Sequence, residues 1–311
     1  MARFAATIRY TVGMTEGAIK KFQSVVLEHY ALHGRHDLPW RTVKANGSFD
    51  SYKILVSEIM LQQTQVPRVI PKFGEFVARF PTTDTLAVAE LGDVLRVWNG
   101  LGYNRRAKYL WQAARAIVQE HGGRIPDERG ALERLPGIGP NTAGAVLAYA
   151  YNQPTVFIET NIRTVFIHHF FAGREKVPDK AITDLAARTL PDNPRIWYWA
   201  LMDYGTYLKQ TVGNKNRAST AYARQSAFHG SRRQVRGRIL RLLSEKPMAR
   251  DELQAVVADE RVPGVLDDLT QEALIAKQGS VNQHGTKQPV SSFPARRTSL
   301  AGSAEPSTRS R

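Results

Sequence analysis

Between residues 16 and 225, apolar residues recur every three or four positions, the period of helices that bury one face. Short segments with proline or glycine break this pattern. These breaks are LPWR (38–41), FPTTD (80–84), NGLGYN (99–104), HGGRIPD (121–127), LPGIGP (135–140), NQPT (152–155) and LPDNPR (190–195). Alternating patterns typical of strands are few. The chain from 16 to 225 is therefore predicted to be an all-α domain of many short helices.

A second, smaller unit is predicted after a basic stretch. From Tyr207 to Arg250 eleven residues are basic, and Glu245 is the single acid. Helical patterns follow in RILRLLSE (238–245), ARDELQAVVAD (249–259) and PGVLDDLTQEALIAK (263–277). Three helices before an apolar-polar segment indicate a small winged-helix-like module at 232–282, with a plain helical hairpin as the alternative.

The two ends of the chain lack the apolar content of a folded core. We expect residues 1–15 to form an N-terminal arm. Residues 283–311 are rich in Ser, Pro, Arg and Gly and have few large apolar side chains. Such a composition is typical of a disordered basic tail.

The charge of the chain indicates the class of its partner. Lys and Arg number 43 against 28 Asp and Glu, which gives a formal net charge of +15. This excess favours a polyanion such as nucleic acid, and the alternative is a protein that is merely basic and soluble. The absence of cysteine excludes disulfides, cysteine nucleophiles and cysteine-ligated metal clusters. No apolar run reaches the length of a membrane span, so we expect a cytoplasmic, nucleoid-associated protein with no membrane partner.

LPGIGPNTAGAVLAYA, residues 135–150, has the pattern of a turn between two helices, which together make a hairpin at 132–150. Gly137 and Gly139 allow the backbone to approach a ligand and to present N–H groups at a helix N-terminus, where a phosphate can bind. We expect Asn141 or Thr142 to cap the second helix. Many such turns only join helices, but the charge of this chain favours a nucleic-acid phosphate.

Glu58 lies within the apolar helical face of SYKILVSEIMLQQTQV, residues 51–66. A carboxyl group that loses water there has a raised pKa and can serve as a general acid. The alternative is a glutamate that reaches solvent or pairs with an arginine to support the core.

Glu159 is in a contrasting position. It follows PTVFI (154–158), which has an extended, β-branched pattern, and precedes a helix that Thr160 or Asn161 would cap. The helix N-terminus favours an anion at this point. A protonated acid and a fixed anion together suit cleavage of an N-glycosidic bond, although a helix-start acid without chemistry is the alternative.

Seven segments carry a resemblance to a known family. They are HGRHDLPWR (33–41), SEIMLQQTQVPRVIPKF (57–73), WNGLGYNRRAKYL (98–110), HGGRIP (121–126), LPGIGPNTAGAVLAYA (135–150), ETNIR (159–163) and ALMDYG (200–205). In this order they resemble the helix-hairpin-helix DNA glycosylases, most closely the MutY-type adenine glycosylases. The resemblance covers residues 30 to 225. It implies an HhH-GPD glycosylase domain at 16–225, built as two helical subdomains with the active site between them.

The resemblance also implies the activity and the residues that perform it. The chain would be a monomeric base excision repair enzyme that flips a mispaired or damaged base out of double-stranded DNA and hydrolyses it off. Glu58 matches the glutamate that protonates adenine, and Glu159 matches the catalytic aspartate. The base-pocket positions are Gln62, Asn141 and Asn161. The DNA-binding positions are Gln63 and Tyr103, which wedge into the duplex, and Leu135, Gly137, Gly139 and Thr142 of the hairpin, where Na⁺ or K⁺ would also bind.

This sequence departs from the family at several points. Glu159 is one methylene, roughly 1.5 Å, longer than the usual aspartate. The four cysteines that follow LMDxG are absent, so we expect no iron–sulfur cluster and no other cofactor, and only the small module stands where a domain that reads 8-oxoguanine usually follows. Asn141 replaces the lysine of bifunctional relatives, which predicts a monofunctional enzyme. Adenine is the expected base, with uracil, thymine or hypoxanthine as alternatives, and a non-catalytic protein that binds distorted DNA is the alternative of another class.

Overall fold

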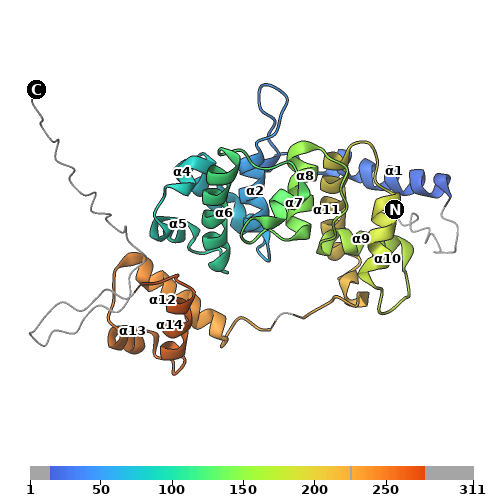
Figure 1. Cartoon of the computed structure of the whole chain (residues 1–311). Helices are drawn as coiled ribbons and strands as arrows, with labels where there is room; N and C mark the ends of the chain where they lie inside the picture. The colour runs from blue at the N-terminus through green and yellow to red at the C-terminus, as the bar shows by residue number, and fades with distance from the viewer. Residues whose placement is uncertain (1–14, 225, 277–311) are drawn as a thin grey trace, which may run out of the picture.

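The structure, a computed structural model, describes residues 15–224 and 226–276 (Figure 1). Its α-helices are α1 (Glu16–His33), α2 (Ser51–Leu61), α3 (Val66–Arg79), α4 (Thr83–Ala87), α5 (Leu91–Trp98), α6 (Arg105–His121), α7 (Arg129–Arg134), α8 (Pro140–Tyr151), α9 (Thr160–Phe170), α10 (Asp179–Arg188), α11 (Pro194–Thr211), α12 (Arg232–Glu245), α13 (Arg250–Val257) and α14 (Val262–Gln271). Two 3₁₀ turns, η1 (Pro39–Arg41) and η2 (Lys215–Ala218), complete them. The described residues contain isolated bridges but no extended strand, so the predicted all-α fold is confirmed.

The helices from α1 to α11 form two groups that α8 joins (Figure 1). In one group, α2 packs on α3 and α6, and α6 also contacts α4 and α5. In the other, α1 returns to pack on α11 beside α9, and α10 contacts α9. Because α8 contacts both α2 and α11, and α11 packs on α9, it connects the helix that carries Glu58 with the helix that follows Glu159.

Aromatic packing fixes the N-terminal helix to the second group. Phe22 of α1 is 1% exposed and lies edge-on to Phe170 and Trp197, with ring centroids 4.9 and 5.6 Å away. Edge-to-face pairs of this kind add to the free energy gained from burial. The core therefore unites segments from the two ends of the region 16–225.

A buried ion-pair network joins the segment before α2 to α11. Asp203, which is 4% exposed, accepts hydrogen bonds from Arg41 Nη1 and Nη2 at 2.8 and 3.0 Å, and from Arg35 Nε at 2.8 Å. Burial alone would raise the pKa of Asp203, but the hydrogen bonds and charges of the two arginines outweigh burial and lower it. The network keeps the Asp203 carboxylate charged inside the protein.

The α7–α8 hairpin has the predicted turn but not the predicted cap. Gly139 is the N-cap of α8, and no side chain caps that helix, so the expectation that Asn141 or Thr142 would do so is wrong. Both residues lie inside the helix, because it already begins at Pro140, a residue suited to the first helical position. Gly137 has a φ of +77°, and a Cβ there would lie 2.5 Å from the Cβ of Tyr109.

Helices α12, α13 and α14 contact one another around buried apolar side chains, among them Ile239, Leu253 and Leu269. The helix α12 begins at Arg232, earlier than the pattern predicted, and α14 ends at Gln271. Residues 277–282, where the wing of the proposed module would continue, lie outside the described residues, as do the predicted tail and residues 1–14 of the predicted arm. Within the described chain, no helix combines the length and apolar character needed to cross a membrane.

Substitution by alanine is expected to have opposite effects on stability at two glycines, Gly137 of the hairpin and Gly74 of α3. Gly137→Ala introduces both a strained positive φ and a clash with Tyr109, and we expect it to lower the free energy of unfolding by about 2–4 kcal/mol. Gly74→Ala, in open space within α3, should raise it by about 0.5–1 kcal/mol. Urea unfolding measures both, and equal effects would contradict the packing described for Gly137.

Candidate active site

Glu58 lies on α2, the helix that contacts α8, and its side chain is partly buried. Loss of water is the main cause that raises its pKa to about 8, and the negative charge of Glu159 adds to this effect. The charge of Arg41 acts in the opposite direction. At neutral pH the Glu58 carboxyl therefore retains its proton and can act as a general acid.

Glu159 is the N-cap of α9, in place of the predicted Thr160 or Asn161. Its Oε1 accepts hydrogen bonds from the backbone N–H groups of Asn161 and Ile162, the latter at 2.9 Å, and its Oε2 accepts from Thr160 Oγ1 at 3.1 Å. The cap prediction was wrong because the backbone of Glu159 is extended, with φ −122° and ψ −178°, which brings its own side chain over the first turn. These contacts hold the Glu159 carboxyl group over the first turn of α9.

The two glutamates interact although they come from different helix groups. The charge of Glu159 raises the pKa of Glu58. Burial is the main cause that raises the pKa of Tyr149, and the charges of both glutamates add to it. Arg41 contributes a positive charge to the same cluster. Sequence reasoning missed Arg41 and Tyr149, although LPWR and LPGIGPNTAGAVLAYA, the motifs that contain them, were recognised.

Lys209 is a further residue that sequence reasoning missed. Its Nζ, on the last turn of α11, donates to Asn161 Oδ1 at 2.6 Å and to Thr160 Oγ1 at 3.2 Å. Burial lowers the pKa of Lys209, while the charge of Glu159 acts to raise it. The available signal was its position as the first residue of the segment that replaces the expected cysteine-bearing loop.

That segment is bound to the helix that Glu159 caps. Asn216 of η2 donates through Nδ2 to the carbonyl oxygen of Thr160 at 2.8 Å. The backbone N–H of Val177, just before α10, donates to the carbonyl of Ala218 at 2.7 Å, and the N–H of Thr220 donates back to the carbonyl of Val177 at 3.0 Å. Side-chain and backbone hydrogen bonds thus hold the segment against α9 and the start of α10.

The three predicted base-pocket residues are each tied to a neighbouring element. Gln62 Nε2 donates to Thr142 Oγ1 at 3.1 Å, which links the end of α2 to the first turn of α8. Asn141 Oδ1 accepts from the N–H of Ile158 at 3.3 Å, immediately before Glu159. With the contact of Asn161 to Lys209, these bonds place the three amides around the ends of the helices that carry the two glutamates.

The predicted wedge residues lie on two exposed loops and share an unusual backbone conformation. Gln63 and Tyr103 have φ angles of +56° and +48°, which are uncommon for residues with a side chain. Each such residue costs roughly 1–3 kcal/mol and persists where surrounding contacts fix it. Strained conformations of this kind are concentrated at functional sites.

Arg106 supplies contacts that fix both loops. Its buried guanidinium donates to the carbonyls of Ile59 at 2.8 Å and Gln62 at 2.6 Å at the end of α2, and to that of Gly102 at 3.1 Å in the second loop. Hydrogen bonds from a charged donor contribute about 1.5–3 kcal/mol each, enough to offset the local backbone strain. Burial lowers the pKa of Arg106 to about 10, so it remains charged at neutral pH.

At the hairpin the backbone is the accessible part. The side chain of Leu135 is 4% exposed and packs in the core, whereas Gly137 and Gly139 are exposed. Among the described residues, no hydrogen-bond partner is found for the N–H groups of these two glycines. With α8 lacking a side-chain cap, its N-terminus presents backbone donors outward, an arrangement that suits an anion.

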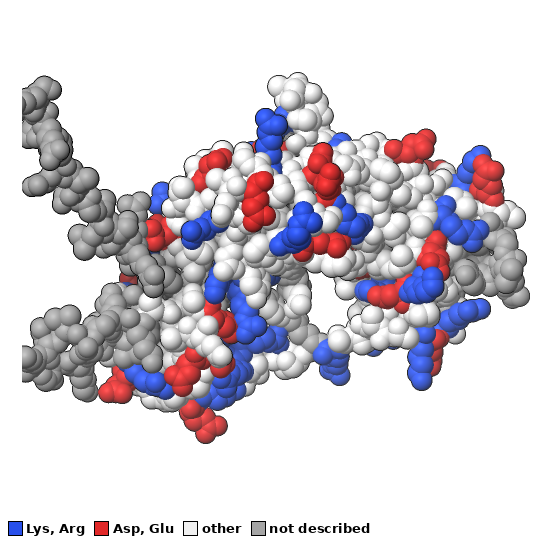
Figure 2. All heavy atoms as spheres, viewed as in Figure 1, with Lys and Arg blue, Asp and Glu red and all other residues white. Residues whose placement is uncertain are grey.

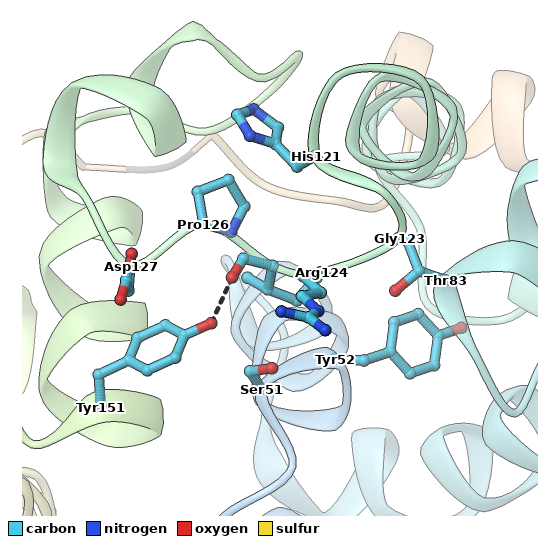
Figure 3. A pocket seen from close by; sticks show the side chains of 10 residues that line it. Ser51, Tyr52, Thr83, His121, Gly123, Arg124, Pro126, Asp127 and Tyr151 are labelled. Carbon is cyan, nitrogen blue, oxygen red and sulfur yellow. Dashed lines mark hydrogen bonds between the residues drawn. The ribbon is translucent and has the colours of Figure 1, made fainter.

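A separate cavity of about 610 Å³ opens at the other end of α2 (Figure 3). Ser51, Arg124 and Tyr151 are among its lining residues, and the Tyr151 hydroxyl donates to the carbonyl of Ile125. None of the predicted site residues lines it. In the part of the chain that the structure describes, no cluster of His, Asp and Glu suited to a metal ion is found.

Comparison with known proteins places this arrangement in a family. Residues 56–189 match the model of the HhH-GPD superfamily base excision DNA repair proteins. The adenine DNA glycosylase of Mycolicibacterium smegmatis is 34% identical over 243 residues, which cover 72% of this chain and 82% of the relative. That of Buchnera aphidicola subsp. Baizongia pistaciae is 35% identical over 192 residues, which cover 60% of this chain and 52% of the relative, so the match spans about half of that relative's length.

A similar solved structure is that of a thermostable thymine-DNA glycosylase. It has 27% sequence identity and a TM-score of 0.53, and the match covers 60% of this chain and 85% of that structure. The sequence match to the family, over residues 56–189, includes both Glu58 and Glu159.

The raised pKa of Glu58 predicts that the stability difference between the native protein and the Glu58→Gln variant depends on pH. Because the folded-state pKa is about 8 and the ordinary value is 4.5, the folded protein binds the extra proton between these values, and its stability falls as pH rises through this window. Because Gln stays neutral, the free energy of unfolding of Glu58→Gln should rise by about 2–4 kcal/mol relative to that of the native protein between pH 4 and pH 9. Urea unfolding across this range provides the measurement, and a constant difference would contradict a raised pKa.

Proposed function

Because the chain belongs to the HhH-GPD superfamily of base excision DNA repair proteins, we propose that it is a monofunctional DNA glycosylase that removes adenine from a mispair in duplex DNA. The observation that carries this proposal is Glu58, whose pKa is raised by burial and by the charge of Glu159, together with the hydrogen bonds that hold Glu159 at the N-terminus of α9. The names of the curated relatives support adenine as the base. The enzyme would then act on DNA in the cytoplasm or nucleoid.

The two glutamates suit the two ends of the bond that breaks. As the bond between base and deoxyribose lengthens, its electron pair moves to the base, and Glu58 donates its proton to that base. Positive charge develops on the sugar and is stabilised by the Glu159 anion. A water molecule then adds to the sugar and returns a proton to Glu58, which leaves an abasic site in an unbroken strand.

The amides near the glutamates would recognise the extruded base. Gln62 uses its nitrogen in the contact with Thr142, while Asn141 and Asn161 use their oxygens in their contacts. In the described structure the opposite end of each amide makes no hydrogen bond and is suited to the edge of a base. A buried amide left unpaired disfavours the wrong base, because its desolvation is not compensated.

The exposed loops and the hairpin would hold the duplex. Gln63 and Tyr103 would occupy the space that the extruded nucleotide leaves, which offsets the loss of base stacking. The N–H groups of Gly137 and Gly139 would bind a backbone phosphate near Leu135 and Thr142, and Na⁺ or K⁺ held by hairpin carbonyls would assist. The protein would act as a monomer.

A substrate panel tests the proposed activity. Duplexes with adenine opposite 8-oxoguanine, guanine or cytosine, and with uracil, thymine or hypoxanthine in mispairs, are incubated with excess protein and then cleaved at abasic sites with alkali. We expect cleavage at adenine, and a loss of at least 100-fold in Glu58→Gln, which retains shape but not the proton. Binding measured by anisotropy should change little in this variant. Cleavage of uracil duplexes alone would exclude adenine as the substrate, and no cleavage with retained binding would favour a non-catalytic DNA-binding protein.

The absence of strand cleavage is a separate expectation. Without alkali the adenine-containing strand should remain intact, and borohydride should trap no protein–DNA adduct, because Asn141 stands where a lysine would attack the sugar. Lys209 is an amine beside this chemistry, because its Nζ contacts Asn161, two residues after Glu159, so Lys209→Met is the matched control. An adduct in the native protein that disappears in Lys209→Met would overturn the monofunctional assignment.

A further inference from the structure

The C-terminal unit α12–α14 contacts the loop that carries Tyr103. Arg233 Nη1 donates to the Tyr103 hydroxyl at 2.8 Å. At the start of the same loop, Asn99 Nδ2 donates to Ser244 Oγ at 3.2 Å, and at its end Arg105 donates to the Glu272 carboxylate. The unit therefore holds the beginning, the tip and the end of one loop.

The sequence of α12 explains why these contacts occur together. Arg233, Arg236, Leu240 and Ser244 are spaced by three or four residues and so lie on one stripe of the helix. Arg236 Nη1 donates to Glu272 at 3.0 Å, which orients the carboxylate that Arg105 also contacts. Figure 2 shows Lys and Arg side chains gathered where this unit borders the start of α6.

Tyr103 is held from two directions. The guanidinium of Arg106 lies 5.5 Å from its ring centroid, and Arg233 binds its hydroxyl, while the residue remains 37% exposed. Its neighbours Gly100 and Gly102 have φ angles of +97° and +74°. Glycines leave a loop many conformations, so the contacts from α12 reduce the conformations that Tyr103 can adopt.

We propose that α12–α14 positions Tyr103 for entry into duplex DNA, with Arg233 as the positioning residue. The unit thereby controls how readily a base is extruded, and it leaves the bond-breaking step at Glu58 and Glu159 unaffected. This inference rests on the proposed function for the role of Tyr103. The fixed hydroxyl reduces the entropy lost when the ring enters the base stack.

Fluorescence of 2-aminopurine measures extrusion independently of cleavage. The analogue replaces the mispaired adenine, and its emission rises when it leaves the stack on addition of saturating protein. We expect Arg233→Ala to lower the extruded fraction relative to the stacked one by about 3- to 10-fold, the range for one lost hydrogen bond. Tyr103→Phe, which keeps the ring and removes the acceptor, should give a similar loss, and the double variant should be no worse than either.

Arg241→Ala is the matched control, because Arg241 is an exposed arginine of α12 outside the stripe. This substitution removes the same charge and should leave the extruded fraction at its native value. A parallel assay uses adenine opposite an abasic site, which is already poorly stacked, so that extrusion costs little. The Arg233→Ala variant should excise this adenine at a rate within about 2-fold of the native rate.

Three results would overturn the inference. The first is a native extruded fraction in both Arg233→Ala and Tyr103→Phe. The second is a double variant in which the losses of the two single variants add, and the third is a loss in Arg241→Ala equal to that in Arg233→Ala. Failure of the native protein to excise any base, with extrusion still dependent on Arg233, would reject the proposed function and retain this inference.

Discussion

The buried guanidinium of Arg106 fixes the relation between α2 and the two loops that face outward beside it. Carbonyl groups at the end of a helix have no partner within that helix, and Arg106 binds those of Ile59 and Gln62. The same side chain binds Gly102 of the second loop. The position of Glu58, three residues before the end of α2, is therefore set by the group that also fixes Gln63 and Tyr103. Loss of the Arg106 guanidinium would disturb the general acid as well as the proposed DNA contact.

The pairing of Glu58 with Glu159 depends on a second set of contacts, because the two residues belong to different helix groups. The hydrogen bonds of Gln62 to Thr142 and of Asn141 to Ile158 connect these groups beside the glutamates. Lys209 and Asn216 hold the first turn of α9 from the opposite side. Each of these bonds is made by a short polar side chain or by one ammonium group. The electrostatic environment of the site is thus built from elements distant in sequence and fixed by few side chains.

Much of the fold could be predicted from local pattern, whereas several contacts could not. The period of apolar residues and the Pro and Gly breaks predicted the helices, and the apolar face around Glu58 indicated its raised pKa. The caps of α8 and α9 were predicted incorrectly, because residue type alone does not reveal whether a helix begins one residue earlier or whether a glutamate folds back over its own helix. The contacts of Lys209 and Arg233 could not be predicted from the local pattern. Their roles depend on α11 and α12 meeting residues about 50 and 130 positions away, which only the tertiary fold specifies.

The segment between α11 and α12 is divided into two parts by its own contacts. Its first part, through Thr220, is hydrogen-bonded to the helices around Glu159, so it folds together with them. Residues 221–231 then connect to α12, and a chain of this length can span at most roughly 40 Å. A tether this short keeps the C-terminal unit at a high effective concentration, in the millimolar range, near the Tyr103 loop. Contacts too weak to hold two separate molecules together can therefore keep this unit docked, and its release would be readily reversible.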